Sequence, residues 1–397
     1  MILCFADVEL DLLRYELRRD GERVPVEPQV FEVLVHLVRH HDRVVTKEEL
    51  LDEVWGSRFV SESALTTRIK AARRAVGDDG SRQAVIRTVH GRGYRCVAPV
   101  TEVAADPGAP NLAQPTLEMR QEIRFCRSSD GVGLAYACHG QGPALLKVAN
   151  WLTHLDHDWQ SPLWRHWLRD LGRGHRLIRY DERGCGLSDR DVDDYSLDAW
   201  VRDLEAVVDD SGLDRFPLLG ISQGAAVAIA YTVAHPDRVT HLVLYGAYAR
   251  GLLAGDTTAQ QQAQAKVLID MARVGWGLRT SAFRQAFATA FMPEGTPEQW
   301  AAFDELQRQS TSPDNAVRFL ETFFQLDVRH LAPEVRVPTL VLHCRGDQVW
   351  PLEDGRQLSA GIPGSRFVPL ESRNHLLLED EPAWSGFIDE IERFLAT

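Results

Sequence analysis

The stretch that decides the fold of this chain is Leu218-Leu219-Gly220-Ile221-Ser222-Gln223-Gly224-Ala225-Ala226. The apolar run at 216–219 predicts the end of a buried strand, and the small residues at 225–234 predict a helix packed against a sheet. Between them lies the pattern G-x-S-x-G. In so tight a strand-to-helix turn the serine is strained and its oxygen is exposed, and glycines stand where a Cβ would collide with backbone. Ser222 is therefore a candidate nucleophile, and the alternative is a glycine-rich turn with an incidental serine.

The size and composition of the chain are those of a soluble protein long enough for two domains. It has 397 residues, with ordinary apolar and charged fractions of 44% and 25%. The segment 1–7 lacks the basic start of a signal peptide, and no apolar run approaches the ~20 residues that span a bilayer. The six cysteines form no C-x-x-C pair, which favours reduced thiols over disulfides or a zinc site. We therefore expect a cytoplasmic protein with no membrane partner.

Charge is distributed unevenly along the chain. The first hundred residues carry 16 basic and 16 acidic side chains, so the net charge of −13 belongs to the remainder. Within 62–95, eight basic residues stand against three acidic ones. An acidic molecule with one basic face presents only that face to phosphate, and this favours a nucleic-acid binder.

The N-terminal hundred residues combine short strands, helices and a hairpin. Alternation of apolar and charged residues predicts strands at 4–5, 8–10 and 15–17. Helical periodicity predicts helices over 27–40, 46–56 and 61–77. Thr46 caps the second helix, with Glu49 three residues later as a capping box. The third helix has one apolar stripe at 65, 69, 72 and 76, and strands at 85–89 and 94–97 then form a hairpin with Arg92 at its tip.

This order of elements and the closing Arg87-Thr88-Val89-His90-Gly91-Arg92-Gly93-Tyr94-Arg95 resemble the winged helix-turn-helix domain of OmpR/PhoB-type response regulators. The resemblance covers residues 1–100. It implies an α+β domain that binds double-stranded DNA, with the third helix in the major groove and the hairpin, or wing, at the minor groove.

Positions in the resemblance imply roles for individual side chains. Thr66 and Thr67 would face base edges, and Arg92 would enter the minor groove. Phosphates would be held by Arg68, Lys70 and Arg73. Ala71 stands where many relatives carry an arginine that contacts bases. We therefore expect few direct contacts to the bases of the DNA. For any single basic residue the alternative is a solvated helix face.

A second domain follows a linker. Residues 99–119 contain four prolines without periodicity, which predicts the linker. Over 120–397, predicted strands alternate with helices, which indicates a mainly parallel sheet with helices on both faces. The stretch 250–330 is helical without strands, so we expect a helical lid over the carboxyl ends of the strands. The predicted domains are thus a winged helix at 1–98 and an α/β domain at 120–397.

Three further segments of the second domain carry a resemblance to α/β-hydrolases. They are D-x-R-G-x-G-x-S at 181–188, Asp347 in a loop after a strand, and His375 after the last strand. The chain order Ser222, Asp347, His375 is the order of this fold. A serine hydroxyl needs a neutral imidazole to take its proton, and a carboxylate orients that imidazole and stabilises its cation. Individually, Asp347 could be a loop cap and His375 a surface histidine.

The oxyanion site departs from the family pattern. One backbone N–H would come from Gln223 at a helix N-terminus. Trp151 is the best positional donor of the other, but Ala149-Asn150 stands where the family usually has His-Gly. Among the Trp and His residues that follow, His154 and His157 could share a helix face, yet no third ligand has matching spacing. We therefore expect an aromatic pocket wall, no metal and no cofactor.

These features favour a one-component transcription regulator, in which a hydrolase-like domain senses a small apolar or ester-like ligand and controls the winged helix. The alternative is an active serine hydrolase, an esterase or C–C hydrolase, with a DNA-binding arm. A third possibility is an inactive scaffold for dimerisation, against which the intact triad argues. We expect a homodimer, because winged helices of this kind often bind paired half-sites. The ligand, the operator and the sign of regulation are left open.

Overall fold

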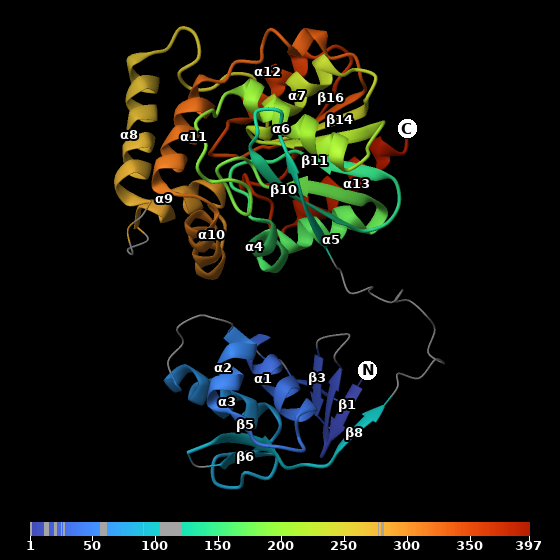
Figure 1. Ribbon diagram of the computed structural model, residues 1–397, viewed down its shortest axis with the longest axis vertical. Helices are drawn as coiled ribbons and strands as arrows, with labels where there is room; N and C mark the ends of the chain where they lie inside the picture. Colours follow the sequence, from blue (N-terminus) through green and yellow to red (C-terminus); the bar gives the residue numbers. More distant parts are fainter. Residues whose placement is uncertain are drawn as a thin grey trace. The chain divides into compact units, whose positions relative to one another are not determined.

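The computed structural model describes residues 2–397 except 12–15, 20–21, 25, 27, 56–61, 90, 104–120, 277 and 279–281. The chain forms two compact units, Met1–Leu117 and Glu118–Thr397 (Figure 1). Each unit has its own apolar core. The finer predicted limits, with a linker at 99–119, stay a prediction.

Within its described residues, the N-terminal unit contains short strands and three helices. In chain order its elements are β1 (Ile2–Phe5), β2 (Val8–Asp11), β3 (Glu16–Arg19), β4 (Glu22–Val24), α1 (Pro28–Arg39), β5 (Val45–Thr46), α2 (Lys47–Trp55), α3 (Glu62–Ala75), β6 (Ile86–Val89), β7 (Gly93–Cys96) and β8 (Val100–Val103). One sheet has the strand order β4-β3-β2-β1-β8, and the other has the order β5-β7-β6. This is the α+β arrangement expected for a winged helix-turn-helix.

The predicted faces of the helices are confirmed where the structure describes them. The stripe of α3 is buried, since Leu65, Ile69 and Ala72 are each at most 1% exposed. The Thr46 hydroxyl accepts the backbone N–H of Glu49 at 3.0 Å, which confirms the cap of α2. Gly56, where the predicted second helix ends, and His90, in the predicted hairpin turn, lie outside the described residues.

The C-terminal unit is a single eight-stranded sheet covered by helices (Figure 1). Its strands are β9 (Glu122–Arg127), β10 (Gly133–His139), β11 (Ala144–Lys147), β12 (Arg176–Tyr180), β13 (Phe216–Ile221), β14 (Val239–Tyr245), β15 (Thr339–Cys344) and β16 (Arg366–Leu370). Their order is β16-β15-β14-β13-β11-β12-β10-β9, parallel except at the two pairs that β10 makes. This confirms the predicted mainly parallel sheet.

Helices connect the strands and cover the sheet. They are α4 (Leu155–Gln160), α5 (Arg165–Gly174), α6 (Leu197–Asp210), α7 (Gly224–Ala234), the short η1 (Ala332–Glu334), α12 (Leu352–Gly361) and α13 (Pro382–Leu395). β11 lies between β12 and β13, so the chain order reverses at this point of the sheet. Ligand crevices of open α/β sheets form at the carboxyl ends of strands where such a reversal occurs.

The predicted helical lid is present between β14 and β15. It consists of α8 (Ala259–Gly275), α9 (Ala282–Phe291), α10 (Pro297–Ser310) and α11 (Pro313–Gln325). Capping boxes at Thr258 and Thr296 start α8 and α10. The lid touches the loops at the carboxyl ends of the strands, because the Phe291 carbonyl accepts the backbone N–H of His375 at 2.8 Å.

Two further observations concern the cysteines and the helices. All six cysteines are free thiols. Among the helices in the described part of the chain, none combines the length and apolar character that crossing a bilayer requires.

Candidate active site and nucleic-acid interface

Ser222 occupies a strained turn between β13 and α7. Its φ is +53°, in the left-handed region that side chains other than glycine rarely adopt. The glycines on either side are required by close backbone contacts. A Cβ on Gly220 would lie 2.7 Å from the Cα of Ala225, and one on Gly224 would lie 2.5 Å from the carbonyl oxygen of Ala149. The turn is therefore the one that the sequence pattern predicts.

Asp347 and His375 form a tight buried pair. Each follows its own strand, β15 or β16, and Oδ2 of Asp347 lies 2.6 Å from Nδ1 of His375. The other oxygen, Oδ1, accepts the backbone N–H groups of Val349 and Trp350 at 2.8 and 3.0 Å. Burial by itself would raise the pKa of Asp347, but the facing imidazole outweighs it and the pKa lies below its ordinary value. An anionic Asp347 fixes the proton of His375 on Nδ1.

The second ring nitrogen of His375, Nε2, is buried and makes no hydrogen bond in the structure. Ser222 and His375 line one cavity, although no hydrogen bond joins them. In a triad, Nε2 is the atom that takes the serine proton. Such bonds are often long before substrate binds.

The cavity beside Ser222 is small and apolar. Its walls are mostly aromatic and leucine side chains: Trp151, Leu152, Trp164, Ile221, Phe291, Phe303, Leu306 and Leu376. Phe291 belongs to α9, and Phe303 and Leu306 to α10, so the lid closes the cavity. The free volume is about 10 Å³, roughly the space that one water molecule needs. Any larger ligand has to displace part of this wall.

The two residues expected at the oxyanion site are bonded to each other. The backbone N–H of Trp151 donates to Oε1 of Gln223 at 2.9 Å. Nε2 of the same amide donates to Oε1 of Glu182 at 3.2 Å. An N–H can only donate, so the orientation of the Gln223 amide is fixed by Trp151. These two bonds are called the Gln223 bridge below.

The ring of Trp151 connects this loop to the lid. It meets Trp276, Phe319 and Phe323 edge to face, with ring centroids 5.4, 5.9 and 5.5 Å apart. Aromatic pairs in this geometry are worth about 0.5–1.5 kcal/mol each beyond their buried area. Trp151 therefore contributes its N–H to the Gln223 bridge and its ring to the packing of the lid.

A buried charged cluster behind the oxyanion loop was not anticipated from the sequence. Nζ of Lys147 contacts Oδ1 of Asn150 and lies 5.1 Å from the centre of the Trp164 ring. Burial lowers the pKa of Lys147 and raises that of Asp158. Burial also raises the pKa of Glu182 to about 8. A lysine inside the apolar run at 145–148 was the available signal.

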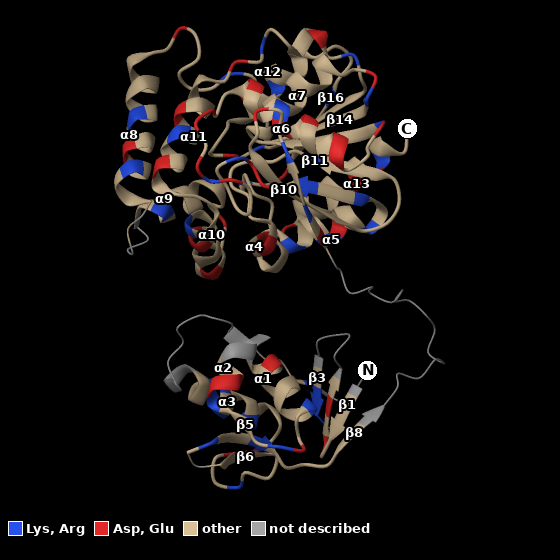
Figure 2. Ribbon diagram, viewed as in Figure 1, with Lys and Arg blue, Asp and Glu red and all other residues tan. Residues whose placement is uncertain are grey.

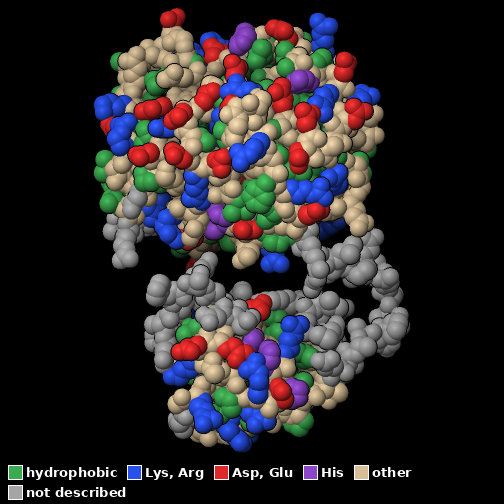
Figure 3. Space-filling view, in the orientation of Figure 1, with side chains coloured by type: hydrophobic (Ala, Val, Ile, Leu, Met, Phe, Trp, Pro, Cys, Tyr) green, Lys and Arg blue, Asp and Glu red, His purple; other side chains and the backbone are tan. Residues whose placement is uncertain are grey.

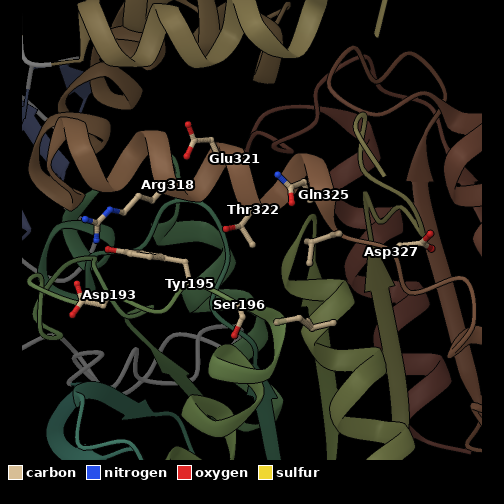
Figure 4. Close-up of a pocket in the computed structure, with 10 residues that line it drawn as sticks. Asp193, Tyr195, Ser196, Arg318, Glu321, Thr322, Gln325 and Asp327 are labelled. Carbon is tan, nitrogen blue, oxygen red and sulfur yellow. The ribbon is translucent and has the colours of Figure 1, made fainter. Parts of the chain in front are cut away.

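A second, larger cavity of the C-terminal unit lies away from Ser222 (Figure 4). It measures about 690 Å³ and runs between α11 and the segment that enters α6. Most of its lining residues are polar or charged, among them Asp193, Arg318 and Glu321, and the leucines Leu197 and Leu326 also line it. It shares no lining residue with the Ser222 cavity. Its size alone does not make it the reactive site, because it lacks a nucleophile paired with a base.

The predicted DNA-contacting residues lie on α3 and on the turn between β6 and β7. Figure 2 shows the basic residues of these elements, and in Figure 3 basic side chains gather at the end of the unit that carries the hairpin. On α3, Thr66, Thr67 and Lys70 are exposed, and Arg68 is half-buried. Arg92 is exposed at the turn. The turn is close to the body of the unit, since a Cβ on Gly93 would lie 2.0 Å from the carbonyl oxygen of Val45.

Arg73, which is predicted to contact a DNA phosphate, also forms hydrogen bonds within the N-terminal unit. Its guanidinium donates to the carbonyl of Ile86 at 3.0 and 2.9 Å and to the hydroxyl of Thr88 at 2.8 Å. These bonds join α3 to β6 and occupy Nε and Nη2. Only Nη1 is left to offer to a phosphate, so the predicted contact of Arg73 would be secondary to its bonds to the wing.

Comparison with known proteins defines the class of each unit. The chain belongs to the α/β hydrolase fold family, which it matches over residues 160–382. Residues 21–96 match the family described as transcriptional regulatory protein, C terminal. The fold class predicted from the sequence, a winged helix-turn-helix followed by an α/β-hydrolase fold, is thereby confirmed.

Particular relatives are known for both parts. A 2-hydroxy-6-oxononadienedioate/2-hydroxy-6-oxononatrienedioate hydrolase of Klebsiella pneumoniae is 30% identical over 283 residues, 67% of this chain and 88% of that protein. The DNA-binding response regulator MtrA of Mycobacterium tuberculosis is 34% identical over 99 residues, 25% of this chain and 43% of that protein. The solved structure of an esterase of Exiguobacterium antarcticum has the same fold as the C-terminal unit, with a TM-score of 0.59 and 22% sequence identity. The match covers 69% of this chain and 99% of the esterase.

Proposed function

We propose that this protein is a one-component transcription regulator, whose winged helix binds double-stranded DNA under the control of a ligand held beside Ser222. The observation that carries the proposal is the Gln223 bridge. It occupies the Trp151 N–H that would otherwise stabilise an oxyanion. Loss of one oxyanion donor typically slows acyl transfer by about 10²–10³-fold. A site in this state favours holding a ligand over converting it.

The lid supplies a route by which occupancy can be signalled. The cavity has room for about one water molecule, so a ligand has to move aromatic side chains of the lid. Trp151, which lines the cavity itself, packs on three other aromatic rings of the lid region, Trp276, Phe319 and Phe323. A ligand that moves the lid therefore also disturbs the Gln223 bridge. The apolar walls favour a small apolar or ester-like molecule.

The regulator is tested with the full chain. Duplexes selected from a random library by the protein would be assayed for affinity with and without a panel of short-chain esters. A change in affinity that Ser222→Trp abolishes supports the proposal, because the larger side chain fills the cavity. Equal affinity with every ester, when those esters bind the protein by calorimetry, contradicts control by this site.

A second candidate, an active serine hydrolase, is favoured by a different observation. The Asp347–His375 pair is assembled, and Nε2 of His375 is buried without a partner beside Ser222. Substrate binding that breaks the Gln223 bridge would complete the site. Wild type and Ser222→Ala are compared on p-nitrophenyl esters of short acids. Equal background rates contradict hydrolase activity, and slow turnover by wild type alone would reset the regulator.

A homodimer remains part of the proposal, since paired half-sites are the usual targets of such winged helices. The mass of the DNA-bound protein in solution tests it. A single copy per duplex would contradict it.

A further inference from the structure

Three possible metal ligands meet in the N-terminal unit, away from Ser222. His36 lies on α1, His40 follows the end of that helix, and Glu49 lies in the first turn of α2. One candidate ligand atom from each lies within 4.8 Å of the other two, and all three residues are half-buried. His36 and His40 share a face because they are four residues apart in a continued helical turn, in which His40 N–H donates to the His36 carbonyl at 3.2 Å. Their ring centroids are 4.4 Å apart.

The hydrogen bonds around the cluster leave Nε2 of His40 available, whereas Nε2 of His36 and both oxygens of Glu49 already have partners that a metal would replace. Nδ1 of His40 lies 2.9 Å from the carbonyl oxygen of His36. A carbonyl only accepts, so Nδ1 carries the proton and Nε2 keeps its lone pair. This is the arrangement that usually orients a metal-bound histidine. Nε2 of His36 already lies 3.0 Å from Oε1 of Glu49, close to the roughly 3.3 Å between two ligand atoms on one tetrahedral zinc ion.

We propose that His36, His40 and Glu49 bind a first-row divalent transition metal such as Zn²⁺. Two imidazole nitrogens and a carboxylate oxygen suit zinc, nickel or copper better than the all-oxygen preference of calcium and magnesium. Three protein ligands leave a position for water, so the ion exchanges with solution. The spacing of the histidines was visible in the sequence, but the partner from α2 was not, because only the fold brings it within reach.

Arg43 competes with the metal. Its guanidinium holds both oxygens of Glu49, at 2.8 and 2.6 Å. The Arg43 side chain is 44% exposed, so it can withdraw into water when a cation takes its place. The ion would join the end of α1 to the first turn of α2, next to the helix-turn-helix. Metal binding is thereby expected to stabilise the packing of the DNA-binding unit.

The test uses the full chain, stripped with a chelator, and measures Zn²⁺ binding by calorimetry and Co²⁺ binding by visible absorption. His36→Ala and Glu49→Gln are expected to weaken binding at least about tenfold, and Arg43→Ala to strengthen it. His41→Ala is the matched control. His41 is exposed and adjacent, with Nδ1 placed against the Val38 carbonyl at 3.0 Å, and its loss leaves binding unchanged.

Two results would overturn the proposal. One is equal Zn²⁺ affinity of wild type, His36→Ala and Glu49→Gln. The other is the lack of any binding at millimolar metal by both wild type and Arg43→Ala. Glu49→Gln preserves the shape of the side chain, and circular dichroism of each variant shows whether the unit is folded. A zinc-dependent rise in the unfolding temperature of wild type that His36→Ala lacks provides the second readout.

Discussion

The two halves of the Ser222 site differ in what their polar groups are bonded to. On the acid–base side, Asp347 holds His375 at 2.6 Å and leaves Nε2 unpartnered. On the oxyanion side, the Trp151 N–H is already bonded to the side chain of Gln223. The first half has the Asp–His bond that the predicted triad requires, and the N–H of the second half already has an acceptor within the protein. In the proposed regulator, the chain thus keeps the groups predicted to activate the serine and withholds the N–H predicted to stabilise the charge that follows.

The largest effect is expected from the acid–base half. Replacing the acid of such a triad by its amide typically lowers kcat by about 10⁴-fold, because the imidazole then adopts the wrong tautomer. Asp347→Asn should reduce any ester hydrolysis to the level of Ser222→Ala, while calorimetric ligand affinity is kept. Hydrolysis by Asp347→Asn at the wild-type rate would show that the Asp347–His375 pair has only a structural role. The two halves of the Ser222 site would then no longer differ in function.

The oxyanion half should respond in the opposite direction. Gln223→Met removes the acceptor but keeps the length of the side chain, so the Trp151 N–H becomes available. Ester turnover should rise by up to about 10²–10³-fold, measured as kcat on p-nitrophenyl esters. Gln325→Met, at an exposed position on α11, controls for the substitution itself. A variant no faster than wild type would mean that this N–H does not limit the reaction.

The carboxyl group at the other end of the Gln223 bridge makes stability depend on pH. Burial raises the pKa of Glu182 to about 8, above the ordinary ~4.3. The folded protein therefore holds this proton more tightly than the unfolded chain. That stabilisation is complete below about pH 4, declines as pH rises and is lost above about pH 8.

Glu182→Gln has no such proton. Its free energy of unfolding relative to wild type should therefore rise between about pH 5 and pH 9, by on the order of 3 kcal/mol. Urea denaturation at both pH values measures this difference. Glu298→Gln, at an exposed site on α10, should show no such trend. A flat difference for Glu182→Gln would indicate that this carboxyl titrates normally.

The smallest expected effect extends the comparison to the DNA-binding unit. Arg92→Ala removes one positive charge that is expected to lie near DNA phosphates. Affinity for duplex DNA should therefore fall several-fold, and the slope of log affinity against log salt concentration should become smaller by about one. Fluorescence anisotropy over a salt series measures both quantities. Arg39→Ala, exposed on α1, is the control. Unchanged binding by Arg92→Ala would exclude the wing from the interface.

The features that the sequence predicted are local or set by strand order. The turn at Ser222 follows from glycines within two residues, and the meeting of Asp347 with His375 follows from the common edge at which parallel strands end. The stripe of α3 follows from helical period. Each of these patterns spans few residues, and each reflects a steric or geometric constraint that is the same in every protein with that turn, sheet or helix.

The features that it did not predict depend on single rotamers and on long-range burial. The Gln223 bridge joins residues 72 positions apart through one side-chain conformation. Lys147 stands in an apolar run, where nothing in the sequence indicates a partner for its charge. Only the fold brings carboxylates close to it. Arg73 has the spacing of a surface residue, but the return of β6 gives its guanidinium two acceptors inside the unit.

The contact between Trp151 and Trp276 allows the position of the lid to be followed by circular dichroism. Two indoles with centroids 5.4 Å apart at an interplanar angle of 67° couple their electronic transitions, so the near-ultraviolet circular dichroism of the pair depends on its geometry. Any ligand that separates the rings changes that signal without a label. Other indole pairs, Trp164–Trp167 and Trp167–Trp384, lie equally close, so the difference spectrum between wild type and Trp276→Phe is the one that reports the position of the lid.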